Sequence, residues 1–114
     1  MSIKRGDIFI AVLDPVVGSE IAKTRPLVVV SNDLNNQFSA TVTVLPLTSG
    51  KPEKIYPFEV FLSKGKGNLP KDSRVKADQI RTIDKPRLAS RIGRLGPGEM
   101  TQIENAIKVH LQLA

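Results

Sequence analysis

The sequence predicts a mainly β fold, a small curled sheet or barrel, with one helix at its C-terminal end. Five to seven short segments are rich in β-branched and aromatic residues, and Gly, Pro, Asn and Ser separate them. After Gly96-Pro97 the apolar residues change to a helical spacing. Of the 114 residues, 40% are hydrophobic and 25% are charged, which is a globular composition, and we expect one domain over residues 1–114.

The first half of the chain predicts three strands. Residues 7–13 are rich in β-formers, whereas residues 14–24 contain Pro, Gly and Ser and predict a long loop. Residues 25–31 form an apolar β-branched run, which tolerates a proline at its start. Residues 32–36 predict a turn or one helical turn, and residues 39–48 alternate Thr and Val, which is typical of a half-buried strand.

The second half predicts further short strands and the closing helix. Strands are expected at residues 58–62, 73–78 and 80–84, where β-formers recur between glycines and short breaks. Beyond Pro97, apolar residues recur at spacings of three and four, so we expect an amphipathic helix of about 15 residues.

Composition excludes several classes of function. The chain has no cysteine and one histidine, so disulfide frameworks, thiol nucleophiles and multi-histidine metal sites are excluded, and we expect no cofactor and no metal. No apolar run is long enough for a membrane span, and residues 1–7 lack the apolar region of a signal peptide. The expected location is the cytoplasm.

The positive charge lies in the second half of the chain. The net charge is +6, and residues 1–62 carry equal numbers of basic and acidic side chains, so the excess falls after residue 62. Ten basic residues occupy residues 64–94. Such a stripe suits a polyanion, most simply a nucleic acid, although a solubilising surface explains the charge equally well.

Three local patterns could carry chemistry. Arg25 begins a strand at a position that Pro26 constrains, and Thr48-Ser49 place two hydroxyls at a strand end. Lys76 and Asp78, two apart on a predicted strand, would share one face. Each pattern alone is also explained by an ordinary surface charge, turn or ion pair.

Together, these patterns resemble one family over nearly the whole chain, from about residue 5 to 113. The chain resembles the MazF/PemK/Kid family of toxin–antitoxin endoribonucleases. The motifs that carry the resemblance, in order, are Gly6-Asp7-Ile8, Gly18-Ser19-Glu20, Arg25-Pro26, Asn32-Asp33, Pro46-Leu47-Thr48-Ser49, Lys76-Ala77-Asp78-Gln79 and Arg81-Thr82-Ile83-Asp84.

The resemblance implies an SH3-like, PemK/CcdB-type β-barrel that forms a homodimer. It also implies sequence-specific, metal-independent cleavage of single-stranded mRNA and neutralisation by a cognate antitoxin protein. The catalytic arginine and threonine of the family fall on Arg25 and Thr48, and its loop glutamate on Glu20. An arginine and aspartate of the Kid branch align with Lys76 and Asp78, where lysine keeps the charge but loses bidentate geometry.

The expected chemistry is transesterification. Without a metal site, the 2′-OH of the RNA is the natural nucleophile, giving 2′,3′-cyclic phosphate and 5′-OH ends. Arg25 would stabilise the phosphorane charge and Thr48 would donate a further hydrogen bond, while Glu20 is the candidate base. Because a guanidinium stays protonated at neutral pH, the expected role of Arg25 is electrostatic rather than acid–base.

RNA contacts are expected from the loops and one aromatic ring. Phe58 is the most plausible stacking platform, and Ser19 and Ser49 are expected to read the RNA with Lys76 and Asp78. Two other readings stay open: a non-catalytic, CcdB-like gyrase-binding toxin, and an inert SH3-like RNA-binding module.

Overall fold

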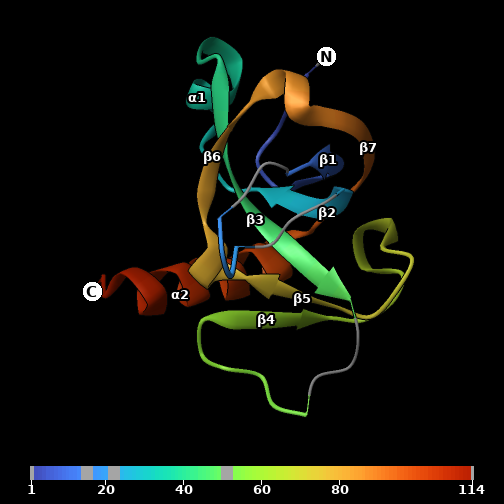
Figure 1. Cartoon of the computed structure of the whole chain (residues 1–114), viewed down its shortest axis with the longest axis vertical. Coiled ribbons are helices and arrows are strands. Elements are labelled where there is room, and N and C mark those ends of the chain that lie inside the picture. The colour runs from blue at the N-terminus through green and yellow to red at the C-terminus, as the bar shows by residue number, and fades with distance from the viewer. Residues whose placement is uncertain (1, 14–16, 21–23, 50–52, 114) are drawn as a thin grey trace.

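The computed structural model of the chain describes residues 2–13, 17–20, 24–49 and 53–113 (Figure 1). The strands are β1 (Asp7–Val12), β2 (Thr24–Val29), β3 (Thr41–Ser49), β4 (Glu59–Leu62), β5 (Ser73–Lys76), β6 (Arg81–Asp84) and β7 (Leu88–Arg94). The α-helices are α1 (Asp33–Phe38) and α2 (Pro97–Leu111), and short 3-10 helices are η1 (Lys66–Asn68), η2 (Ala77–Gln79) and η3 (Lys85–Arg87). The expected mainly β fold with a C-terminal helix is confirmed.

The strands form one antiparallel sheet around β3. The order is β4-β5-β3-β2-β1-β7, with β6 also paired to β3. Val44 pairs with β2 on one edge of β3 and with β6 on the other. β5 and β6 follow each other along that second edge, with η2 between them. Among the described residues no pairing joins the terminal strands β4 and β7, so the sheet is curled but open.

Two apolar cores lie on the two faces of this sheet. One contains Leu45, Leu47 and Val75, and α2 covers it with Met100 and Ile103. The other is enclosed by the curl of the sheet, and its members include Phe9, Leu27, Val44, Ile83 and Leu88. Successive residues of a strand point to opposite faces, which is why neighbouring residues of β3 enter different cores.

Helix α2 agrees with its sequence prediction in length and in its N-terminal signals. Pro97 is its first residue, and the Glu99 carboxylate accepts a hydrogen bond from the Gly96 amide at 3.0 Å. Met100 and Ile103 are buried, whereas Leu111 is 47% exposed, so the apolar stripe leaves the core before the helix ends. No helix in the described ranges is long and apolar enough to cross a membrane.

Two local predictions need correction. The predicted strand at residues 73–78 ends at Lys76, because Asp78 lies in the 3-10 helix η2. Of the turn or helical turn expected at residues 32–36, the helical alternative is correct: it is helix α1, capped by the Asn32 side chain, which accepts from the Asn35 amide at 2.8 Å. Strand β7 was not predicted, since residues 88–94 lack both alternation and an apolar run.

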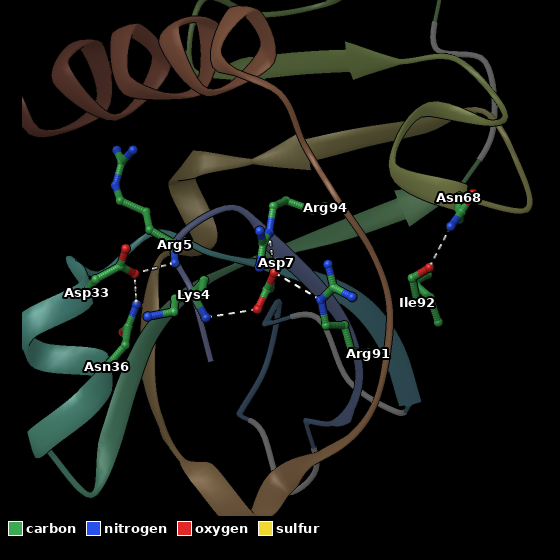
Figure 2. Close-up of polar contacts among 9 residues, drawn as sticks. All are labelled: Lys4, Arg5, Asp7, Asp33, Asn36, Asn68, Arg91, Ile92 and Arg94. Atoms are coloured by element: carbon green, nitrogen blue, oxygen red, sulfur yellow. Dashed lines mark hydrogen bonds and ion pairs between the residues drawn. The ribbon is translucent and has the colours of Figure 1, made fainter. Parts of the chain in front are cut away.

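The buried Asp7 carboxylate ties β1 to β7 (Figure 2). Its Oδ1 accepts from Arg91 Nε at 3.0 Å and from Arg94 Nε at 2.8 Å, and its Oδ2 accepts from the Lys4 amide at 2.8 Å. A register shift between Ile8 and Phe9 leaves one extra residue on β7, which brings the two arginines to the same face. Burial raises the pKa of Asp7, but these hydrogen bonds outweigh burial and hold it below its ordinary value.

We expect the substitution Asp7→Ala to lower the free energy of unfolding by about 2 kcal/mol at pH 7, because the Lys4 amide and two arginines lose their acceptor. Urea denaturation measures it, with the exposed Asp84→Ala as control, expected within about 0.5 kcal/mol of wild type. Because the folded pKa of Asp7 is lowered, its contribution is present above the unfolded value of 3.8 and is lost as the pH falls through the folded value. If the difference in unfolding free energy between Asp7→Ala and wild type stayed unchanged as the pH fell through the folded pKa of Asp7, this assignment would be contradicted.

A glycine contact joins η1 to the same strand. A Cβ on Gly93 would lie 2.0 Å from the carbonyl oxygen of Gly67, and the Asn68 side chain donates to the Ile92 carbonyl at 3.0 Å (Figure 2). Gly67 itself has a φ of +54°. The loop can therefore lie this close to β7 only if position 93 has no side chain.

The substitution Gly93→Ala is expected to destabilise the fold by about 1–3 kcal/mol or more, because backbone atoms must move to admit the methyl group. Gly98→Ala is the matched control, since a Cβ there meets nothing within 4 Å. Gly98 lies in α2, so alanine should be neutral or stabilise by up to about 1 kcal/mol. Equal thermal midpoints for the two variants would show that the Gly93 contact is not needed.

Candidate functional site

Strands β2 and β3 carry Arg25 and Thr48 at the same end of their ladder. Leu27 pairs with Pro46 in the last pair of this ladder, and Arg25 and Thr48 each lie two residues beyond that pair. Because side chains alternate along a strand, the two side chains are expected on the face that Leu27 and Pro46 occupy. Both residues are partly exposed, which leaves them accessible from solvent.

Strand β5 places a second arginine beside Thr48. Thr48 pairs with Arg74, and Arg74 pairs in turn with Phe61 of β4. The face that carries Thr48 therefore continues across β5 and β4. We call Arg25, Thr48 and Arg74 the cross-strand row; it runs from β2 through β3 to β5.

A buried carboxylate of β4 lies next to the row. Glu59 pairs with Lys76 across β4 and β5 and is 5% exposed. Its Oε2 accepts from Lys76 Nζ at 2.5 Å and lies 3.6 Å from Arg74 Nη1, while its Oε1 accepts from the Tyr56 amide at 3.2 Å. Burial raises the pKa of Glu59, but the Lys76 bond, the Tyr56 amide and the charge of Arg74 outweigh it, so the pKa is lowered.

Lys76 and Asp78 are close, as predicted, although η2 rather than a strand places the aspartate. Lys76 Nζ lies 3.6 Å from Asp78 Oδ1. Lys76 therefore balances two carboxylates, those of Glu59 and Asp78, and its ammonium is only partly available to another anion.

Phe58 lies in a small aromatic group beside this cluster. Its ring is stacked on that of Tyr56, with centroids 5.4 Å apart, and the ring of His110 on α2 lies 6.4 Å away. Lys76 Nζ lies 5.9 Å from the Phe58 centroid, so the aromatic group and the charged cluster are continuous. The candidate platform Phe58 thus comes from the turn before β4.

Ser49 faces a different space from Thr48. A pocket of about 270 Å³ contains Ser49 in its lining, which consists of Ile10, Thr24, Arg25, Pro26, Leu47, Ser49, Pro70, Lys71 and Ser73. Because successive side chains alternate along β3, Thr48 points to the opposite face. The structure therefore separates the two hydroxyls that the sequence places side by side.

Ser19 and Glu20 lie on an exposed loop. The Glu20 carboxylate accepts from the Val17 amide at 3.1 Å, so it closes a turn within its own loop. The chain between Glu20 and β2 lies outside the described residues. Among the described residues no three His, Asp or Glu side chains form a group that could hold a metal ion.

Sequence reasoning missed Glu59. Nothing in the order of residues distinguishes this glutamate from a solvated one, and only the register of β4 against β5 shows that it faces Lys76 and Arg74. The same register gives Arg74, one of many basic residues in its segment, a place opposite Thr48.

The fold and this site define a small antiparallel β protein with a row of arginines and a threonine on one exposed sheet face. The model of the PemK-like, MazF-like toxins of type II toxin–antitoxin systems matches residues 4–111. Endoribonuclease MazF of Staphylococcus epidermidis is 40% identical over 111 residues, which cover 97% of this chain and 92% of that protein. This chain therefore belongs to the PemK-like, MazF-like toxin family.

Solved structures agree with this assignment. MazF of Deinococcus radiodurans has a TM-score of 0.83 at 25% identity, covering 98% of each chain. A mycobacterial endoribonuclease in complex with its cognate antitoxin has a TM-score of 0.80 at 26% identity, covering 98% of this chain and 97% of that one. Mycobacterium tuberculosis toxin MazF-mt6 has a TM-score of 0.78 at 27% identity, covering 95% and 98%.

Proposed function

We propose that this chain is an endoribonuclease toxin that cleaves single-stranded mRNA and is neutralised by a cognate antitoxin protein. Two findings support this function: the chain belongs to the toxin family, and it is 40% identical in sequence to an endoribonuclease over 97% of its length. A solved relative is an endoribonuclease in complex with its antitoxin. The observation that carries the proposal is that Arg25 and Thr48 each lie two residues beyond the last pair of the β2–β3 ladder, in a chain of this family.

The proposed reaction is transesterification within the RNA. The 2′-oxygen attacks the adjacent phosphorus and loses its proton to Glu20, while the bond to the 5′-oxygen breaks and that oxygen gains a proton. The products are a 2′,3′-cyclic phosphate and a 5′-OH end, without a metal or cofactor. Arg25 and Thr48 donate hydrogen bonds to the phosphorane oxygens, where negative charge develops.

The surrounding residues supply RNA contacts in this proposal. Phe58, with Tyr56 stacked on it, offers a face for a base, and Lys76 and Asp78 lie beside it with polar atoms for base edges. Ser19 contacts the RNA from its exposed loop, and Ser49 contacts it from the end of β3, on the opposite face from Thr48. Recognition thus comes mainly from the turn before β4, from β5 and from η2, whereas the two donors to the phosphorane, Arg25 and Thr48, lie on β2 and β3.

The proposed setting follows from the substrate and the family. The toxin acts in the cytoplasm, where mRNA is translated, and works as a homodimer. The antitoxin is its protein partner, as the complex of the mycobacterial relative with its own antitoxin supports.

We expect the purified protein to cleave a long single-stranded RNA in EDTA at discrete sites, with cyclic-phosphate ends, and to leave the corresponding DNA intact. Arg25→Ala and Thr48→Val should each lower kcat by about 10²–10³, because each removes a donor to the transition state. Lys108→Ala, an exposed site on α2, is the control with unchanged activity.

The same assay separates the other readings. Retarded but intact RNA would favour the inert RNA-binding module and overturn the enzyme. No cleavage and no binding would leave only the gyrase-binding reading. Cleavage by Arg25→Ala at the wild-type rate would overturn the role given to Arg25.

We expect KM to rise steeply with salt while kcat changes little. Counterion release governs how RNA binds to a protein with a net charge of +6, whereas the chemistry occurs after binding. Initial rates at several KCl concentrations, from limiting to saturating RNA, measure both constants. If the rate at saturating RNA fell with salt as steeply as affinity does, this separation of binding from chemistry would be wrong.

A further inference from the structure

Arg74 occupies the position opposite Arg25 in the cross-strand row. Thr48 lies between them, with β2 on one edge of β3 and β5 on the other (Figure 1). Directly opposed residues of antiparallel strands have Cβ atoms about 4.5–5.5 Å apart, so the Arg74 side chain begins beside Thr48. Arg74 therefore begins one strand away from Thr48, on the edge of β3 opposite β2.

Glu59 attracts the Arg74 guanidinium from the β4 side of β5, the side away from Thr48. The carboxylate comes from β4, is buried, and lies 3.6 Å from Arg74 Nη1. That separation is an ion pair but too long for a good hydrogen bond. The hydrogen bond to the same oxygen comes from Lys76 Nζ instead. Glu59 thus attracts Arg74 without using its N–H donors.

The Arg74 guanidinium has an N–H donor that no neighbouring residue accepts from. Within the described part of the chain its Nε is buried and has no hydrogen-bond partner, and its one ion pair is that with Glu59. Lys76, in contrast, is paired with both Glu59 and Asp78. The Arg74 side chain is 27% exposed and starts on the same sheet face as Thr48. Unsatisfied donors of this kind are uncommon in native proteins, and a bound water or ligand oxygen accounts for them.

We infer that Arg74 is a second phosphate-binding arginine of the cleavage site, held by Glu59 on the side of Thr48 opposite Arg25. This inference rests on the proposed ribonuclease function. A phosphodiester has two non-bridging oxygens, and one guanidinium on each side of Thr48 contacts them from opposite directions. Arg74 is a binding residue in this assignment, and Glu59 is a positioning residue that acts through it.

The test uses the full-length protein and a short RNA that contains one mapped cleavage site. Single-turnover cleavage of this RNA is measured, together with binding to the same RNA carrying a 2′-deoxy group at the scissile nucleotide. Arg74→Ala should lower both affinity and cleavage rate at least tenfold. It should also lower the slope of log K against log salt by about 0.7, the value for one phosphate contact on a single strand.

Three further variants show whether the role is structural. Arg74→Lys keeps the charge beside Glu59 but loses the two-pronged donor set, so most of the loss in cleavage should remain. The Arg74→Lys variant also decides the test if Arg74→Ala does not fold. Lys108→Ala, an exposed position on α2 with the same charge change, should alter affinity less than twofold and leave the salt slope unchanged. In a Glu59→Gln background, Arg74→Ala should cost several-fold less than in wild type.

The outcomes separate this inference from the proposed function. If wild type cleaves the RNA and Arg74→Ala cleaves it within twofold of the wild-type rate, the role of Arg74 is overturned and the ribonuclease function stands. The same conclusion follows if Arg74→Ala binds the RNA with an unchanged salt slope. A wild-type protein that cleaves no RNA overturns both. Equal effects of Arg74→Ala in the wild-type and Glu59→Gln backgrounds overturn the positioning role of Glu59.

Discussion

Strand β3 is the constraint on which the rest of this structure depends. It is the strand that pairs with β2 on one edge and with β5 and β6 on the other, so it links the two parts of the sheet. Its alternate residues enter two different cores, one covered by α2 and one enclosed by the curled sheet. Because β3 is shared, Arg25 of β2 and Arg74 of β5 flank Thr48, although the sequence separates all three widely.

Two buried carboxylates organise much of the positive charge. Asp7 binds two arginines of β7, and Glu59 attracts a lysine and an arginine of β5. The basic segment at residues 64–94 is therefore not a uniform polyanion-binding stripe. Several of its cations pair with carboxylates of the chain itself: Lys66, Arg74, Lys76, Arg91 and Arg94. The same kind of interaction serves the fold at Asp7 and, in our proposal, the RNA site at Glu59.

Sequence patterns were reliable where local physics decides the structure. The Thr–Val alternation of β3 and the spacing of Met100, Ile103 and Ile107 in α2 each require one buried face, whatever lies opposite. These patterns failed where the segment that pairs with a stretch of chain decides its structure. Residues 88–94 are a strand because Asp7 and β1 pair with them, and Asp78 leaves the strand because η2 is inserted between β5 and β6 along one edge of β3.

The sequence by itself determined the fold class and the family, and it singled out Arg25 and Thr48 as candidates, because hydrophobic period and motif order are properties of the chain read in one dimension. Only the tertiary structure decided which side chains share a face and a level. It separated Ser49 from Thr48 by the alternation of β3, and it placed Arg74 opposite Thr48 through the register of β5. It also buried Glu59 between two cations. Strand register is set by packing between distant segments, and no local pattern records it.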